Sequence, residues 1–452
     1  MTVTTSRPLL RILGLGFGLA IGFGGTIGTG ILRLPGMVAA ALGDRTLIIG
    51  LWVLGGVYAV MGAMAVAELA TLHPEAGGFR VYARHAFGER VGFVIGWCDW
   101  LVCVAALAYS SMAAVTFLGT LWPTATVNPQ LTAFALLAAV FALHWTGLRL
   151  GSSLTSIISL SIGLLLMALV VGCFIAAPAT SVTAPPLPGT AASLPWNSLA
   201  AMLLAVPALR AVLSAFDGWY SAIYMAEENT DPVRTLPRAI IGGTLLIASL
   251  YLLINLALLR VLPLPVLAAS KLPAADAAQV LWPHGGAILV TVFSLLTLVS
   301  LLNNLMLTTP RILFALGRDG LFSDRVAVVS DGGTPRTALA ITAATAVVMI
   351  LSGTFEQILA LFAVLFLLCY LSAFLAVFAL RYREPERPRP FKDLGYPFST
   401  GIVLLGTVAF LVAAVAQDPR SGLVGAIFVT ACVPAYAWMA RRRRLRIATA
   451  TA

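Results

Sequence analysis

Long apolar segments alternate along the chain with short segments that hold nearly all of its charged residues. A helix needs roughly 17–25 mostly apolar residues to cross the hydrocarbon core of a bilayer, and each apolar segment is at least that long. The alternation therefore predicts an all-α polytopic membrane protein with twelve transmembrane helices. The segments cover residues 11–42, 46–71, 90–121, 130–147, 152–177, 197–226, 238–262, 286–310, 337–353, 356–380, 399–416 and 421–440.

The composition agrees with lipid as the surrounding solvent. Of the 452 residues, 60% are hydrophobic and 10% are Asp, Glu, Lys or Arg, and the mean hydropathy is +0.97. Soluble domains carry about 25% charged residues, so this chain has too few charges to cover a surface in water. The composition excludes a soluble enzyme, a disordered chain and a secreted disulfide scaffold.

The placement of positive charge predicts the orientation. With the N-terminus inside, 22 of the 28 Lys and Arg residues fall in inner segments and 4 fall in outer segments. Because Lys and Arg concentrate in cytoplasmic loops, we expect both termini in the cytoplasm and the chain in the cell (inner) membrane. The net charge of +10 then belongs to the cytoplasmic face and does not indicate nucleic-acid binding.

Glycines interrupt the first apolar segment, with four of them in residues 24–30. Glycine weakens a helix, and non-helical backbone at membrane depth is tolerated only where it faces protein or a water-filled cavity. Close helix packing is the alternative use of glycine. We predict a broken helix whose substrate-binding residues are Gly25, Thr26, Ile27, Gly28, Thr29 and Gly30.

The sixth segment carries a matching interruption, where an acid, a glycine and aromatic rings lie near the middle of the span. An intramembrane carboxylate is costly and usually faces a cavity or a partner. A structural ion pair between Asp217 and Arg210, on the same helix face, is the alternative to a binding role. The predicted substrate-binding residues here are Ala215, Phe216, Asp217 and Gly218.

Interruptions five segments apart are expected of two inverted five-helix repeats. Half-helix N-termini offer N–H groups to an anion, and unwound carbonyls accept hydrogen bonds from an ammonium group. An amino acid carries both groups close together, so it is the expected substrate. The predicted regions are a cytoplasmic N-terminus (1–10), repeat one (11–177), repeat two (197–380), a cytoplasmic loop (381–398), two further helices (399–440) and a basic cytoplasmic tail (441–452).

Five groups of motif residues occur along the chain. They are residues 25–32 with 35–36, 67–70 with 74–79 and 82, 216–219 with 227–239, 311 with 317–322 and 334–335, and 389–391 with 395–397. In order and spacing they resemble the amino acid–polyamine–organocation (APC) superfamily of permeases. The Asp-Gly-Trp at 217–219 is most similar to L-amino-acid exchangers and bacterial neutral amino acid permeases.

The resemblance implies a LeuT-type five-plus-five inverted-repeat fold with two extra C-terminal helices. It also implies carboxylate binding at residues 26–30, ammonium binding by carbonyls near residues 215–217, and an aromatic gate near Phe216. Trp219 is the second aromatic residue that we single out as a gate candidate.

The fifth segment departs from a pattern seen in proton-coupled members of this superfamily. Proton-coupled relatives can carry a lysine in the fifth helix, near Ser161 and Ile162 here, and the fifth segment holds no Lys or Arg. The absence of this lysine therefore favours exchange without an ion, or proton coupling through another group. The candidates for coupling or for an ion pair are Arg33, Asp99 and Asp217.

Sodium is the less favoured ion. Hydroxyl groups in the eighth segment could complete a sodium site, but ordinary helix packing accounts for them as well. They belong to Thr297, Ser300, Thr308 and Thr309.

These features predict a secondary transporter of amino acids, most consistent with neutral L-amino acids, that works by alternating access as an exchanger or a proton symporter. A cationic amino acid or polyamine antiporter and an amino acid sensor that moves nothing are the alternatives. No catalytic pair, metal-ligand spacing or nucleotide motif occurs, so we expect neither an enzyme nor a metal or cofactor site.

Overall fold

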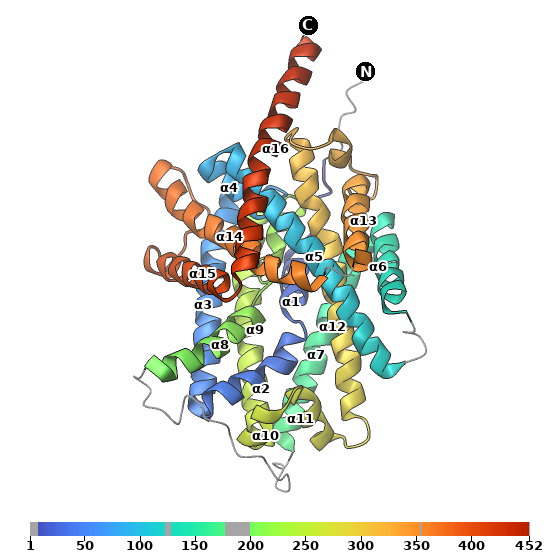
Figure 1. Ribbon diagram of the computed structural model, residues 1–452, viewed down its shortest axis with the longest axis vertical. Coiled ribbons are helices and arrows are strands. Elements are labelled where there is room, and N and C mark those ends of the chain that lie inside the picture. The colour runs from blue at the N-terminus through green and yellow to red at the C-terminus, as the bar shows by residue number, and fades with distance from the viewer. Residues whose placement is uncertain (1–7, 123–127, 177–198, 353–354, 452) are drawn as a thin grey trace.

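The computed structural model describes residues 8–122, 128–176, 199–352 and 355–451, and these residues form helices and no named strand. Parts of several predicted regions lie outside the described residues, among them residues 1–7 of the N-terminus, and residues 177–198, which include the last residue of the fifth segment and the first two of the sixth. The chain folds into a bundle of long helices (Figure 1).

The first half of the chain begins with a broken span and continues with four long helices. Its elements are α1 (Leu15–Thr26), α2 (Gly30–Leu42), α3 (Arg45–Leu72), the short α4 (Phe79–Phe87), α5 (Glu89–Leu121), α6 (Pro129–Thr146) and α7 (Leu148–Ile175).

The second half repeats this order. Its elements are α8 (Leu199–Ala215), η3 (Ser221–Glu228), α9 (Pro232–Val261), the short α10 (Leu264–Ala269) and α11 (Pro273–Leu281), α12 (Gly286–Arg318), η4 (Asp324–Ala327), α13 (Arg336–Ser352) and α14 (Phe355–Arg383). Two further helices, α15 (Phe398–Gln417) and α16 (Pro419–Thr451), complete the chain.

The helices agree with the apolar segments. Within the described ranges, nine helices are long and apolar enough to cross a membrane, and the bent pair of α1 and α2 makes a tenth. The two remaining predicted spans are α8, which η3 continues after a break, and α13, which has 17 residues. Large apolar side chains are exposed on the long helices, such as Leu54 of α3 and Leu160 and Leu164 of α7, as expected where lipid covers them.

Equivalent helices of the two halves pack against each other. The second helices α3 and α9, the third helices α5 and α12, and the fourth helices α6 and α13 form three such pairs. The first broken span contacts α9 through α1, and the sixth contacts α3 through α8. This exchange of partners is what an inverted repeat produces, so the chain is a polytopic membrane protein of the LeuT type.

Different short helices lie at the two ends of the bundle. Helix α4 and the C-terminal end of α16 lie at one end, and α10 and α11 lie at the opposite end (Figure 1). Helix α16 continues through the arginines of the predicted tail, where Arg443 forms an ion pair with Glu89 at the start of α5.

Candidate functional site

The first span breaks over residues 27–29. Helix α1 ends at Thr26 and α2 begins at Gly30, and the axes of the two helices differ by 48°. Ile27 is extended (φ −78°, ψ 99°), so the chain leaves the helix at this residue. Because the first N–H groups of a helix lack an i−4 acceptor within it, the start of α2 presents N–H groups and the positive end of its dipole; the N–H of Leu32 donates to the carbonyl of Thr29 at 3.2 Å.

The sixth span breaks between α8, which ends at Ala215, and η3, which begins at Ser221. Gly218 has φ +108°, a conformation that side chains with a Cβ rarely adopt. The 3₁₀ geometry of η3 and the turn before it leave the carbonyls at the end of α8 outside a regular helix.

The two breaks touch each other. A Cβ atom added at Gly218 would lie 2.2 Å from the carbonyl oxygen of Gly25, and one added at Gly25 would lie 2.4 Å from Oγ of Ser221. Glycine at both positions lets the two backbones approach at contact distance. The structure therefore brings residues of the two predicted interruptions together.

Tyr251 of α9 links the ends of α1 and α8. Its hydroxyl donates to the carbonyl oxygen of Thr26 at 3.2 Å and to that of Ala215 at 3.1 Å. The ring is buried and packs against Phe216 and Trp52. The sequence-based prediction missed this residue, although a tyrosine within the apolar segment 238–262 is a signal that a buried hydroxyl needs a partner.

Gly28 faces open space. Apart from Gly28 and its two chain neighbours, no atom lies within 4 Å of a Cβ atom built on Gly28, and a Cβ on Gly30 would contact only the side chain of Leu34 outside its own helix backbone, at 3.4 Å. Residues 28–30 are half-buried, whereas Thr26 and Ile27 are buried. The N–H side of the first break is thus the part of the break region with room for a ligand.

Phe216, Asp217 and Trp219 of the sixth break line a cavity that does not include the first break. Together with residues of α3, α8, α14 and α15, they line a cavity of about 410 Å³, which none of residues 25–30 lines. Phe216 packs against Trp52 and Tyr251, and the Trp219 ring stacks on Tyr370 of α14 with ring centroids 5.9 Å apart. Of the predicted residues, Gly25 and Gly218 meet, while Phe216, Asp217 and Trp219 lie on the cavity side.

Neither buried acid forms the ion pair considered from the sequence. Asp217 accepts a hydrogen bond from the Tyr370 hydroxyl at 2.9 Å, and Asp99 of α5 accepts one from the Tyr224 hydroxyl at 2.7 Å. Oδ2 of Asp99 is buried without a hydrogen-bond partner in the described parts of the chain. Arg33 is exposed and forms no ion pair with any other described residue. Arg210 donates to Gln417 of α15.

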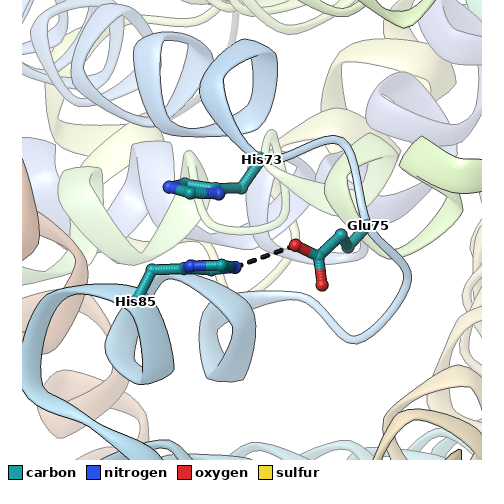
Figure 2. A group of neighbouring side chains, drawn as sticks. All are labelled: His73, Glu75 and His85. Atoms are coloured by element: carbon teal, nitrogen blue, oxygen red, sulfur yellow. Dashed lines mark hydrogen bonds and ion pairs between the residues drawn. The ribbon is translucent and has the colours of Figure 1, made fainter. Parts of the chain in front are cut away.

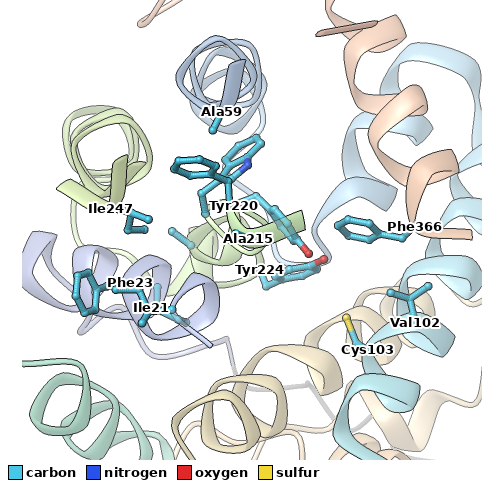
Figure 3. Close-up of a cluster of buried hydrophobic side chains, with 14 of the residues drawn as sticks. Ile21, Phe23, Ala59, Val102, Cys103, Ala215, Tyr220, Tyr224, Ile247 and Phe366 are labelled. Atoms are coloured by element: carbon cyan, nitrogen blue, oxygen red, sulfur yellow. The ribbon is translucent and has the colours of Figure 1, made fainter. Parts of the chain in front are cut away.

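The tyrosines that hold these acids belong to one aromatic cluster behind the sixth break. Tyr220 lies close to Tyr224 and to Phe366 of α14, with ring centroids 6.2 and 5.8 Å apart (Figure 3). Tyr220 also contacts Tyr370 at 5.5 Å. The cluster therefore connects η3 to α14 through ring contacts and to the two acids through hydroxyl groups.

Hydroxyl and amide groups of α7 and α12 surround α1 just before its break. Ser159 donates to the carbonyl of Ala20 at 2.8 Å, and Asn304 donates to the carbonyl of Ile21 at 3.0 Å. A Cβ on Gly24 would lie 2.7 Å from Oγ of Ser159 and 2.8 Å from Oγ of Ser300. The α7 serine that reaches α1 is thus Ser159, whereas Ser161, near the family's lysine position, donates to Ile157 in its own helix.

A buried ion pair closes the end of the bundle that holds α4. Arg311 of α12 donates to both carboxylate oxygens of Glu228, at 2.8 and 3.2 Å, and the side chains are 1% and 0% exposed. The carbonyl oxygen of Glu228 also accepts from the N–H groups of Ile12 and Leu13, at 3.1 and 3.0 Å. The segment before α1, η3 and α12 are held together at this point.

Helix α4 adds a second set of ion pairs to this end. Arg80 and Arg84 both contact Asp319 at the end of α12, and Arg84 also donates to Glu75 at 2.6 Å. The hydrogen bond from His85, with the charge of Arg84, lowers the pKa of Glu75 to about 2 against the effect of burial. Burial, with the charges of His85 and Arg387, lowers the pKa of His73 to about 4.

Two broken spans that meet inside an inverted-repeat bundle define a membrane carrier of the LeuT type. The comparison with protein families agrees: residues 9–439 match the amino acid permease family, and the chain belongs to that family. The family and the relatives found are carriers, which agrees with the expectation that the chain is not an enzyme.

Relatives of this chain are amino acid transporters in bacteria and mammals. The serine/threonine exchanger SteT of Bacillus subtilis (strain 168) is 27% identical over 97% of this chain and 99% of its own length. The b(0,+)-type amino acid transporter 1 of Mus musculus is 26% identical over 92% of this chain and 85% of its own. The Asc-type amino acid transporter 1 of Homo sapiens is 27% identical over 95% of this chain and 82% of its own.

Proposed function

We propose that this permease is a secondary transporter of neutral L-amino acids in the cell (inner) membrane, with both termini in the cytoplasm. The observation that carries the proposal is the direct contact between the two breaks at Gly25 and Gly218, beside the open space at Gly28. The names of the relatives support amino acids as the substrate class.

The two breaks offer opposite partial charges to a zwitterion. The start of α2 at Gly30 presents N–H groups to the substrate carboxylate, and the carbonyls near Ala215 and Asp217 accept from its ammonium group. Residues 25–30 and 215–218 are the proposed binding residues. Gly28 matters most, because its missing side chain leaves the space that the carboxylate occupies.

Alternating access then requires the closed end to open. The contacts of Glu228 with Arg311 and with the segment before α1 exist only while η3 packs against α12. Phe216 and Trp219 are the proposed gate, because their rings turn with the sixth break and pack against α3, α9 and α14.

Exchange without an ion, or coupling to a proton, fits the chain better than coupling to sodium. Asp217 and Asp99 each have a tyrosine hydroxyl and no cation as their nearest partner among the described contacts. A carboxyl group in that setting can gain and lose a proton without breaking an ion pair. Both residues join moving parts of the carrier, since Tyr224 belongs to η3 and Asp217 to the sixth break.

The second candidate is a cationic amino acid or polyamine antiporter, which the carboxylate of Asp217 beside the sixth break favours. The third is an amino acid sensor, which would bind substrate and move none. Both remain outcomes of the same assay.

Counterflow in proteoliposomes tests the proposal. Purified protein is reconstituted, the vesicles are loaded with one unlabelled amino acid, and uptake of labelled serine, leucine, arginine and putrescine is measured with and without a pH or sodium gradient. We expect saturable counterflow of the neutral amino acids. Flux of arginine or putrescine alone would establish the antiporter, and binding without counterflow would establish the sensor.

A further inference from the structure

Two histidines and a glutamate meet beside the closed end of the bundle. His73 follows the last residue of α3, Glu75 lies in the loop after it, and His85 belongs to α4 (Figure 2). One ring nitrogen of each histidine and one carboxylate oxygen of Glu75 all lie within 4.8 Å of one another. The imidazole rings are stacked, with centroids 3.6 Å apart and planes 16° apart.

One nitrogen atom of the cluster is buried without a hydrogen-bond partner among the described residues and could bind a metal ion. His73 is 3% exposed, yet its Nε2 atom has no hydrogen-bond partner among the described residues. A buried polar atom without a partner is unusual. His85 Nε2 is 2.8 Å from Oε1 of Glu75, so a single proton joins two groups that can both bind a metal ion. Two imidazoles and one carboxylate form a common protein ligand set for Zn²⁺.

The distances fit a small adjustment of the side chains. A tetrahedral ion with ligand bonds of about 2.0–2.1 Å holds its ligand atoms roughly 3.3 Å apart. The bond between His85 and Glu75 must lengthen slightly, and the widest separation, up to 4.8 Å, must shorten. The imidazole rings of His73 and His85 must rotate out of their stacked arrangement so that one nitrogen of each points at the ion. His85 and Glu75 are 30% and 32% exposed, which leaves the fourth position to water.

The neighbouring arginine leaves one carboxylate oxygen free for this role. Nη2 of Arg84 donates to Oε2 of Glu75 and lies 3.3 Å from Nε2 of His85, and Nη1 donates to Asp319 at 2.9 Å, so Arg84 must move away from His85 when an ion binds. Arg84 therefore keeps an ion pair with Asp319 even when Glu75 binds a metal ion. Oε1 can exchange the proton of His85 for a metal ion while Oε2 stays bound to Arg84.

We infer that His73, Glu75 and His85 form a binding site for a divalent transition-metal ion of the Zn²⁺ type. The inference revises the expectation of no metal site, because His73 and His85 are twelve residues apart, and the loop after α3 and helix α4 bring their rings together. A bound ion ties the end of α3 to α4, whose Arg80 and Arg84 hold Asp319. If the chain transports as proposed, Zn²⁺ on this face slows the opening of the closed end.

Calorimetric titration of purified, tag-free protein with ZnCl₂ tests the site. We expect one Zn²⁺ bound per chain, and at least about tenfold weaker binding in His73→Gln and in His85→Gln, since the loss of even a group behind a ligand costs about 10–100-fold. His284→Gln, which changes an exposed histidine in another loop, is the matched control and should bind as the wild type does.

Thermal unfolding without metal checks that each variant is folded. If the wild type binds Zn²⁺ no more tightly than a folded His73→Gln/His85→Gln variant, the site is wrong. The absorption of bound Co²⁺ gives a second readout, because an intense visible band marks four-coordinate geometry, and a weak six-coordinate spectrum would overturn the geometry.

The effect on transport rests on the proposed function and is measured separately. Zn²⁺ sealed inside right-side-out proteoliposomes should slow counterflow of the wild type and leave His73→Gln unaffected. Equal rates with and without Zn²⁺ would overturn the effect on opening. If the wild type shows no counterflow at all, the proposed function fails, and the titration still decides the metal site.

Discussion

The ion pair between Glu228 and Arg311 gives the sharpest quantitative prediction. Both side chains are buried, and each is the charged partner of the other. Removal of one member of a buried pair leaves an uncompensated charge and costs about 3–5 kcal/mol, whereas replacement of both members costs far less. Glu228→Gln and Arg311→Met should therefore each destabilise the protein strongly, and the double variant should be more stable than the sum of the two effects predicts.

Thermal and chemical unfolding of the four proteins in the same detergent measures this coupling. We expect a coupling free energy of at least about 2 kcal/mol, since this pair is hydrogen-bonded through two atoms of Arg311. Arg234→Met is the control, because Arg234 is exposed and its nearest acid, Asp231, is 3.8 Å away. Additive effects of Glu228→Gln and Arg311→Met would refute the reasoning.

Three further predictions concern other residues. Tyr251→Phe removes the single hydroxyl proton that two carbonyls at the breaks share. Its loss costs one hydrogen bond, about 1–1.5 kcal/mol, so the substrate concentration for half-maximal counterflow should rise about tenfold, and an unchanged value would contradict this role. Asp217→Asn should keep its contact with Tyr370 and abolish any pH dependence of transport, so an unaltered pH profile would exclude Asp217 as the coupling group. In the presence of EDTA, the free energy of unfolding should fall as the pH decreases from 6.5 to about 4. The reason is that the folded protein lowers the pKa of His73, so protonation favours the unfolded chain. His73→Gln should make the free energy of unfolding depend less on pH in this range, and an equal dependence in both proteins would show that other groups cause it.

The positions of most long helices could be predicted from the sequence, whereas α12 and α16 extend to Arg318 and Thr451, past the predicted ends at 310 and 440. The fourth apolar segment, 130–147, corresponds to α6 (Pro129–Thr146), and the eleventh, 399–416, to α15 (Phe398–Gln417). The agreement arises because the thickness of the bilayer sets the length of an apolar run. The two interruptions were also predictable, since clustered glycines and a carboxylate at mid-span both disfavour a continuous helix in lipid.

The short helices outside the membrane were not predicted. Helix α4 carries Arg80, which is 2% exposed because it contacts Asp319, 239 residues further along the chain. No local pattern identifies such a partner. The same loop brings His73 beside His85, so the metal-ligand cluster depends on tertiary packing and has no spacing motif.

The partners of the buried acids show the same limit. The sequence offered Arg33 and Arg210 as charge partners, whereas the structure places tyrosine hydroxyls next to Asp217 and Asp99. Arg210 was suggested because it lies on the same helix face as Asp217, and Arg33 was suggested because a charged residue beside the first break needs a partner. The tyrosines come from α14 and η3, and only the packing of those elements selects them.

The central claim is that the open space at Gly28, in the first break, holds the substrate carboxylate. Binding of a neutral amino acid to purified Gly28→Leu and Gly50→Leu tests it most directly. No atom lies within 4 Å of a Cβ at either glycine, and Gly50 is exposed on α3, so both variants should fold. We expect Gly50→Leu to bind as the wild type does and Gly28→Leu to lose binding, whereas wild-type affinity in a folded Gly28→Leu protein would contradict the claim.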